Sequence, residues 1–210
     1  MRRGAALLAG AVLALLAPGA AAADPPTDRI VIDVVTANGS GCPLGTTAVA
    51  MSPDNTAMTV TYSRYVARVG AGAEPIEFRR NCQLNLNVHV PNGLTFAVAS
   101  VDYRGFGHLE RGAAGLHQAS YYFQGQGSTQ RSGQRFAGPM NDDWQHNDQL
   151  AVSERVYRPC GVQRNLNINT ELRVYAGSSP RGTASFLTMD STDTAFSTVY
   201  HLTWKTCPAR

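Results

Sequence analysis

The sequence has 210 residues, 43% of them hydrophobic and 16% charged, and a formal net charge of +3. This length suits one domain with a sizeable core. Arg2 and Arg3 supply two of the positive charges from the extreme N-terminus, so the remaining chain is close to neutral. We therefore expect no nucleic-acid partner and no anionic-membrane partner.

The first 23 residues predict a secretory signal peptide. Arg2 and Arg3 precede the apolar run GAALLAGAVLALLA, and the small residues after Pro18 offer cleavage sites behind Ala22 or Ala23. The run is about 14 residues long, which is too short to span a bilayer comfortably. An uncleaved anchor is the alternative. We expect a secreted protein without a membrane span, whose residues 24–210 form a single domain.

The mature chain alternates between apolar and polar residues nearly throughout. In residues 82–90 the even positions are mostly aliphatic and the odd positions carry amides or histidine, as in a half-buried strand. The turn sequence at 91–93 and a second strand at 94–105 predict a hairpin. The other predicted strands are residues 30–35, 46–51, 57–69, 116–123, 150–157, 166–174, 184–189 and 195–204.

No segment of the mature chain shows helical periodicity over three turns. About ten short strands separated by Gly, Pro, Asn and Ser predict an all-β fold, an antiparallel β-sandwich. A closed β-barrel is the alternative.

Four cysteines occur, which in a secreted chain predicts two disulfides. None has the C-x-x-C spacing of a zinc or redox site. Three pairings are open, and we favour Cys42–Cys82 with Cys160–Cys207, one in each half of the chain. Each bond would close a loop of roughly 40 to 50 residues, worth about 4 kcal/mol in the chain-entropy model.

Residues 125–149 are polar and glycine-rich and predict a long loop, which in a compact domain tends to be functional or disordered. Its carboxylates are of the kind that ligate calcium, although the spacing is not that of a known calcium loop. An exposed Trp144 would stack on a sugar or anchor a partner. The alternative is a solvated acidic loop with Trp144 folded onto the core. The candidate binding residues here are Asp142, Asp143, Trp144, His146 and Asp148.

Amides alternate with aliphatic residues in two separate segments, 82–90 and 164–174. If the two strands are neighbours, their amides form a flat polar array that suits sugar hydroxyls, because Asn both donates and accepts hydrogen bonds. The alternative is a solvated sheet face with amides paired across strands. The candidate binding residues are Asn85, Asn87, Asn167 and Asn169, accompanied by His89 and Asn165.

Several separated motifs appear in a fixed order: GCPLGT, FRRNCQLNLNVHVPNGLTF, VDYRGFGHL, YYFQG, GPMNDDW, PCGVQRNLNIN and WKTC. In this order they resemble domain-of-unknown-function family 4360, a family of secreted proteins of actinobacteria and filamentous fungi. The resemblance runs from about Gly41 to Cys207 and includes all four cysteines. It implies a secreted, disulfide-bonded, β-rich domain, and it implies no catalytic residue.

No nucleophile elbow, zinc-protease helix or phosphate-binding loop is found in the sequence. We therefore expect a secreted binding module for a carbohydrate or a cell surface, with no cofactor other than calcium. One alternative is a small hydrolase that uses Asp and His of the 142–148 segment. Another is a secreted toxin or inhibitor.

Overall fold

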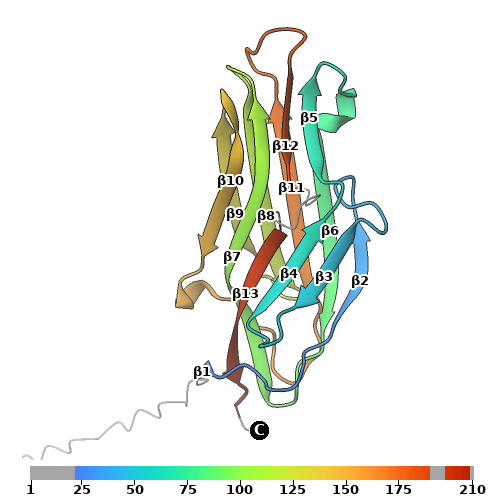
Figure 1. The fold of residues 1–210 in the computed structure, drawn as a ribbon. Helices are drawn as coiled ribbons and strands as arrows, with labels where there is room; N and C mark the ends of the chain where they lie inside the picture. The colour runs from blue at the N-terminus through green and yellow to red at the C-terminus, as the bar shows by residue number, and fades with distance from the viewer. Residues whose placement is uncertain (1–21, 190–196, 209–210) are drawn as a thin grey trace, which may run out of the picture.

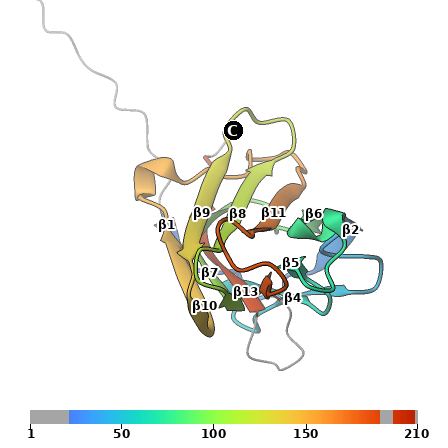
Figure 2. The same cartoon turned by 90° about the horizontal axis from the view of Figure 1, so that it is seen from above.

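The computed structural model describes residues 22–189 and 197–208. Its strands form two antiparallel sheets that pack face to face (Figures 1 and 2). The predicted sandwich is confirmed, and the alternative of a closed barrel is wrong. Within the described ranges, no helix has the length and apolarity needed to cross a membrane.

The larger sheet, sheet A, has eight strands in the order β3-β4-β13-β7-β12-β5, with β1 beside β13 and β10 beside β7. The smaller sheet, sheet B, has five strands in the order β2-β6-β11-β8-β9. Sheet A contains β1 (Ala22–Ala23), β3 (Thr47–Met51), β4 (Ala57–Tyr62), β5 (Val66–Gly70), β7 (Leu94–Leu109), β10 (Met140–Gln149), β12 (Ala184–Thr188) and β13 (Ser197–Thr206). Sheet B contains β2 (Ile32–Asn38), β6 (Arg79–Val88), β8 (Ala114–Phe123), β9 (Gln130–Ala137) and β11 (Leu166–Tyr175).

The core lies between the sheets and is built from the alternating apolar positions. On β11, the inward positions Leu166, Ile168, Thr170, Leu172 and Val174 are all buried, while the residues that alternate with them are partly exposed. Burying one such aliphatic side chain contributes about 1.5–3 kcal/mol. The period-two pattern of the sequence therefore corresponds directly to the inner faces of the strands.

Two predicted strands differ from the structure. Residues 57–69 form two strands, β4 and β5, because the chain turns at Ser63 and Arg64. Residues 150–157 are not a strand but contain the short 3-10 helix η2 (Val152–Glu154). Leu150 is buried and Val152 is 67% exposed, so the apolar residues of this segment do not share one inner face.

The predicted loop at residues 125–149 is wrong. Most of it forms β9 and β10, which are joined across Gly138 and Pro139. The two strands belong to different sheets: β9 is the edge of sheet B beside β8, and β10 pairs with β7 in sheet A. This connection closes one side of the sandwich (Figure 1).

The predicted hairpin at residues 82–105 is also wrong. The turn forms as expected, with the Leu94 amide donating to the Pro91 carbonyl at 3.3 Å. However, β6 pairs with β2 and β11 in sheet B, whereas β7 pairs with strands of sheet A. The turn thus carries the chain from one sheet to the other.

The disulfides are Cys42–Cys82 and Cys160–Cys207, the pairing favoured from the sequence. The first bond links the connection between β2 and β3 to β6. The second bond links the connection between β10 and β11 to the segment that follows β13. The first bond therefore fixes an irregular segment to a strand, and the second joins two segments outside the strands, one of them directly after β13.

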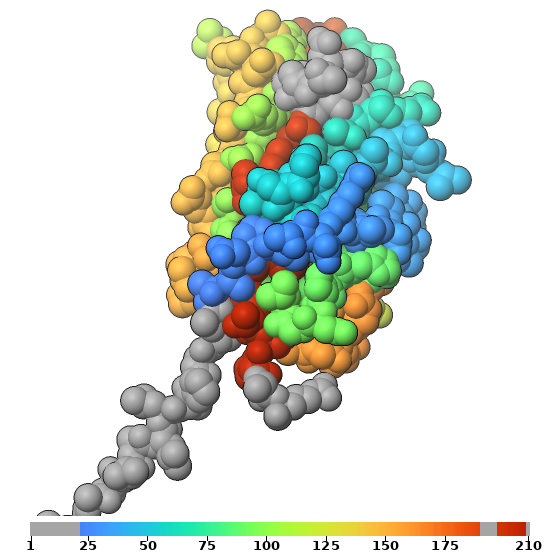
Figure 3. All heavy atoms as spheres, turned by 60° about the horizontal axis from the view of Figure 1, so that its bottom comes forward, coloured from blue at the N-terminus to red at the C-terminus, as the bar shows by residue number. Residues whose placement is uncertain are grey.

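A strap of residues 24–31 leads from β1 to β2 and lies across the end of the sandwich (Figure 3). Asn55, which is buried with φ at 56°, holds it. Its amide nitrogen donates to the carbonyls of Pro26 (2.7 Å) and Asp28 (2.8 Å), and its amide oxygen accepts from the Ile30 amide (3.0 Å). The signal peptide predicted for residues 1–23 lies outside the described residues except for Ala22 and Ala23, which form β1.

Candidate functional site: a polar groove on sheet B

The candidate residues of the 142–148 segment lie on β10, where successive side chains point to opposite faces. Trp144 is 5% exposed, and its ring packs 5.1 Å from that of Phe136 and 5.5 Å from that of His117. Gly105 lies opposite Trp144 in the β10–β7 register, and a Cβ there would meet the indole at 2.5 Å. Trp144 is thus a core residue, and the expectation of an exposed aromatic anchor is wrong.

The acidic groups and the histidine of β10 are spread along the strand rather than gathered at one point. Asp142 and Asp143 face opposite sides of the sheet. His146 is four positions after Asp142, which corresponds to about 13 Å along a strand. His146 contacts the Ser132 hydroxyl at 3.2 Å, and Asp148 accepts from Tyr121 at 3.4 Å. In the part of the chain that the structure describes, no three His, Cys, Asp or Glu residues are grouped to hold a metal ion.

A histidine and a carboxylate do meet on the outer face of sheet A. His201 Nε2 lies 2.8 Å from Asp102 Oδ2, and Asn147 donates to Asp102 Oδ1 at 2.6 Å. The hydrogen bonds from Asn147 and His201 hold the pKa of Asp102 below its usual value. Ser100 is the register neighbour of His201, but no hydrogen bond joins the two side chains. This pair therefore lacks an activated nucleophile.

The two amide-rich strands are neighbours in sheet B, as the amide array requires. Asn85 lies opposite Asn167 on β6 and β11. The Asn85 amide nitrogen donates to Asn167 Oδ1 at 2.8 Å, and Asn165 donates to Asn85 Oδ1 at 2.6 Å. These amides satisfy one another across the strands, so they stabilise the sheet more than they offer free groups to a ligand.

Asn87 is bonded within the same face. Its amide oxygen accepts from Gln163, and its nitrogen lies 3.3 Å from the His89 ring. His89 in turn lies 2.6 Å from Asp33 on β2. The end of sheet B that contains Asn87 is therefore closed by internal contacts.

The other end of the same face is hollowed into a groove of about 420 Å³, called the sheet groove below. It runs over β6, β11, β8 and β9. Its polar lining includes Gln83, Gln118, Ser120, Arg131, Asn169 and Glu171. Of the amide candidates, Asn169 alone belongs to it.

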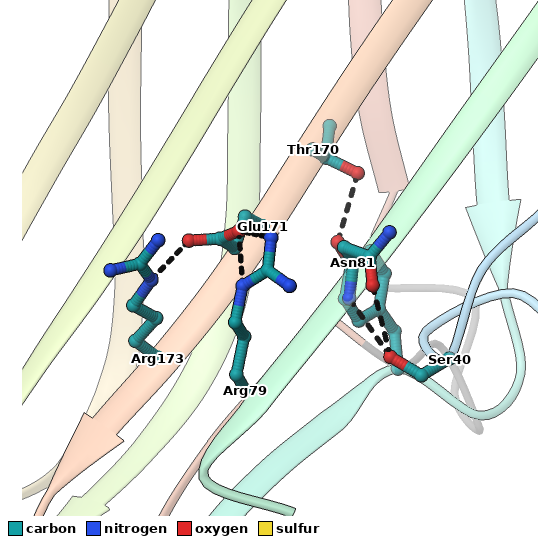
Figure 4. A network of polar contacts seen from close by, with 7 residues as sticks. Ser40, Arg79, Asn81, Thr170, Glu171 and Arg173 are labelled. Atoms are coloured by element: carbon teal, nitrogen blue, oxygen red, sulfur yellow. Dashed lines mark hydrogen bonds and ion pairs between the residues drawn. The ribbon is translucent and has the colours of Figure 1, made fainter. Parts of the chain in front are cut away.

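Two arginines of the sheet groove bracket one carboxylate (Figure 4). Arg79 Nε donates to Glu171 Oε2 at 2.6 Å, and Arg173 Nε donates to Glu171 Oε1. Asn81 on β6 is held by Ser40, which follows β2. The Ser40 hydroxyl donates to the side-chain oxygen of Asn81 and accepts from its backbone amide, each at 3.2 Å. These contacts fix the side chains that form the wall of the groove.

The floor of the groove has room and an unused polar atom. Gly133 on β9 lies opposite Gln118, so no side chain rises from the sheet there. The amide oxygen of Asn169 has no hydrogen-bond partner among the described residues, although it is shielded from solvent. A buried acceptor of this kind costs about 1–3 kcal/mol when it is left unsatisfied.

Sequence reasoning missed the arginines of this groove. On β6, Arg79 lies an even number of residues from Gln83 and Asn85, so the three side chains share one face of the strand. On β11, Arg173 shares a face with Asn169 for the same reason. Arg173 lies on the polar face of the predicted strand 166–174, although it is not among the predicted binding residues, whereas extending the strand at 82–90 by three positions would have placed Arg79 on the amide face. Arg131 had no such signal, because β9 was not recognised as a strand.

The sequence of this chain is similar to that of a known secreted protein and matches a family model. The chain is 39% identical over 183 residues to a protein of Arthroderma benhamiae (strain ATCC MYA-4681 / CBS 112371) named "Uncharacterized secreted protein". The match covers 87% of this chain and 74% of that relative. Together with the two disulfides, it identifies a secreted, extracellular protein. A family model matches residues 28–207, and the chain therefore belongs to the family described as "Domain of unknown function (DUF4360)".

Proposed function

We propose that the protein is an extracellular binding module that holds a carbohydrate in the sheet groove. The observation that carries this proposal is the combination of a groove of about 420 Å³ with a lining of amides, a hydroxyl and guanidinium groups. Sugars present hydroxyls that both donate and accept, and Gln and Asn side chains do the same. Gln83 and Gln118 are exposed, so both can reach such a ligand.

The contacts of the groove support binding rather than turnover. Its one carboxylate, Glu171, is held by two arginines, so both of its oxygens already have partners within the protein. The wall residues come from strands β6, β11, β8 and β9, whose backbone is fixed by continuous pairing. A preorganised polar surface loses little entropy when a ligand binds.

The test is retention of the purified mature protein on insoluble polysaccharides and on bacterial and fungal cell walls. The variants Gln83→Ala and Gln118→Ala remove one groove amide each from an exposed position. Gln145→Ala is the matched control, because Gln145 is exposed on the outer face of sheet A. We expect at least one polysaccharide to retain the wild type and Gln145→Ala but to retain both groove variants more weakly.

Equal retention of all four proteins would contradict a site in the sheet groove. If none of the materials retained the wild type, carbohydrate binding itself would be contradicted. The same assay with a chelator tests for a cation. We expect no change, because the groove is lined by a single carboxylate that is already paired.

A further inference from the structure

A second groove lies beside the first and is lined by three further arginines. It has a volume of about 440 Å³, and we call it the side groove. Glu77 in this groove lies 2.7 Å from Arg68 Nε and 2.7 Å from an Arg80 terminal nitrogen. It thus repeats the arrangement of the sheet groove, in which one carboxylate is held by two arginines.

The two grooves adjoin at Ser40 and Asn81. Ser40 lines the side groove, and Asn81, to which it is hydrogen-bonded, lines the sheet groove. Arg79 and Arg80 are consecutive on β6, so their side chains point to opposite faces, one into each groove. A ligand that follows the surface past Ser40 would therefore meet arginines on both sides.

The grooves carry a strong excess of positive charge. Their two glutamates are each bonded to two arginines, and two further arginines, Arg64 and Arg131, form no ion pair with any described residue. Six arginines against two glutamates leave four positive charges, more than the net +3 of the whole sequence. The arginines concerned are Arg64, Arg68, Arg79, Arg80, Arg131 and Arg173.

We propose that the two grooves together bind one polyanionic polysaccharide, whose acidic groups pair with the arginines of both grooves. This inference rests on the proposed carbohydrate function and specifies its ligand class. Guanidinium groups bind carboxylate and phosphate through paired, charge-assisted hydrogen bonds. Arg131 and Arg64 are the groups available to do so, because they pair with no described residue whereas the other four arginines already hold glutamates.

The lining also separates this ligand from other polymers. Among the residues that the structure describes, no aromatic side chain lines either groove. Flat neutral glycans and single-stranded nucleic acids are commonly held by stacking on aromatic rings. Amides beside free arginines instead match hydroxyls beside acidic groups, which is the surface of an acidic sugar chain.

The experiment measures affinity by calorimetry for the full mature protein and four soluble polymers. Polygalacturonate carries carboxylates, and its fully methyl-esterified form has the same backbone without charge. Poly(glycerol phosphate) distinguishes phosphate from carboxylate as the acidic group, and DNA tests the alternative polyanion. We expect binding to polygalacturonate or to poly(glycerol phosphate) and no comparable binding to the methyl ester. Binding should be lost near 1 M salt, where the screening length is about 3 Å.

The variants are Arg131→Gln for the sheet groove, Arg64→Gln for the side groove, and both together. Both positions are exposed and form no ion pair with a described residue, so we expect both variants to fold. Arg104→Gln is the matched control, since it removes the same charge from an exposed position on sheet A. We expect each groove variant to weaken binding about twofold to fivefold, the double variant to weaken it further, and the control to leave it unchanged.

The outcomes separate this inference from the function on which it rests. Equal binding of the methyl ester, or binding only to neutral polysaccharides, would overturn the polyanion while keeping a carbohydrate module. Tighter binding to DNA than to polygalacturonate and to poly(glycerol phosphate) would overturn the choice of polymer. An effect of Arg131→Gln without an effect of Arg64→Gln would overturn the continuous path across both grooves. No binding to any polysaccharide would overturn both proposals.

Discussion

His117 makes the stability of the sandwich depend on pH in a way that can be calculated. The side chain is fully buried on β8, and neither ring nitrogen has a hydrogen-bond partner among the described residues. The ring of Tyr103 lies 4.4 Å away, and the charge of His146 is close enough to act on it. Burial, with a smaller contribution from His146, lowers the pKa of His117 from 6.5 to about 3.

His117 should make the folded protein less stable at low pH, because the folded protein buries the neutral form of the ring. Above pH 6.5 the ring is neutral in both the folded and the unfolded chain, so His117 adds no pH dependence. Below pH 6.5 the unfolded chain takes up a proton that the folded chain does not, and the free energy of unfolding falls by about 1.4 kcal/mol per pH unit. At pH 4.5 the loss due to His117 should therefore be about 3 kcal/mol.

The assay is urea unfolding of the wild type and of His117→Phe at pH 7.5 and pH 4.5, with the disulfides intact. Phe does not titrate, so the variant should lose about 3 kcal/mol less than the wild type between the two pH values. Comparing the pH dependence of the two proteins cancels the titration of other groups, including Asp102. Equal pH dependence of both proteins would refute the reasoning, because it would mean that the folded protein protonates His117 as readily as the unfolded chain does.

Two further predictions concern the core and the strap. Trp144→Ala should lower the free energy of unfolding by about 3–5 kcal/mol, because it removes a buried ring from between two others; a change below about 1 kcal/mol in urea unfolding would show that the ring is exposed. Asn55→Ala should lower the free energy of unfolding by about 3 kcal/mol, since it leaves three backbone groups of the strap without partners. Asn55→Asp keeps the acceptor for Ile30 but turns a buried carboxylate oxygen toward the carbonyls of Pro26 and Asp28, so it should cost at least as much. Identical thermal melts of Asn55→Ala and the wild type would disprove the role of the strap.

The alternation of residues predicts the inner strands well and the edge strands poorly. β6 and β11 are covered by a neighbour on each side and by the other sheet, so most of their inward positions are aliphatic. The inward positions of β9 and β10 include Ser132, His146 and Asp148, which bond to each other or to Tyr121. Polar residues on both faces conceal the period of two, and this is why residues 125–149 resembled a loop.

The alternation also does not specify which sheet a strand joins. The turn after Val88 has the composition of a hairpin turn, yet it crosses between sheets. For the same reason the sequence could indicate an amide face but not the groove within it. The groove depends on Gly133, on arginines from three strands and on the free oxygen of Asn169, which come together only once the order of the strands is known.

The described chain begins at β1 and ends just after β13, at the same end of the sandwich (Figure 1). The 3-10 helix η1 (Pro75–Phe78) and the first half of β6, which border both grooves, lie at the opposite end. A copy attached through either of these chain ends to a bead, a sensor chip or a fusion partner would therefore present both grooves to the medium. Immobilised protein and display fusions can thus be used to search for the ligand without covering its binding surface.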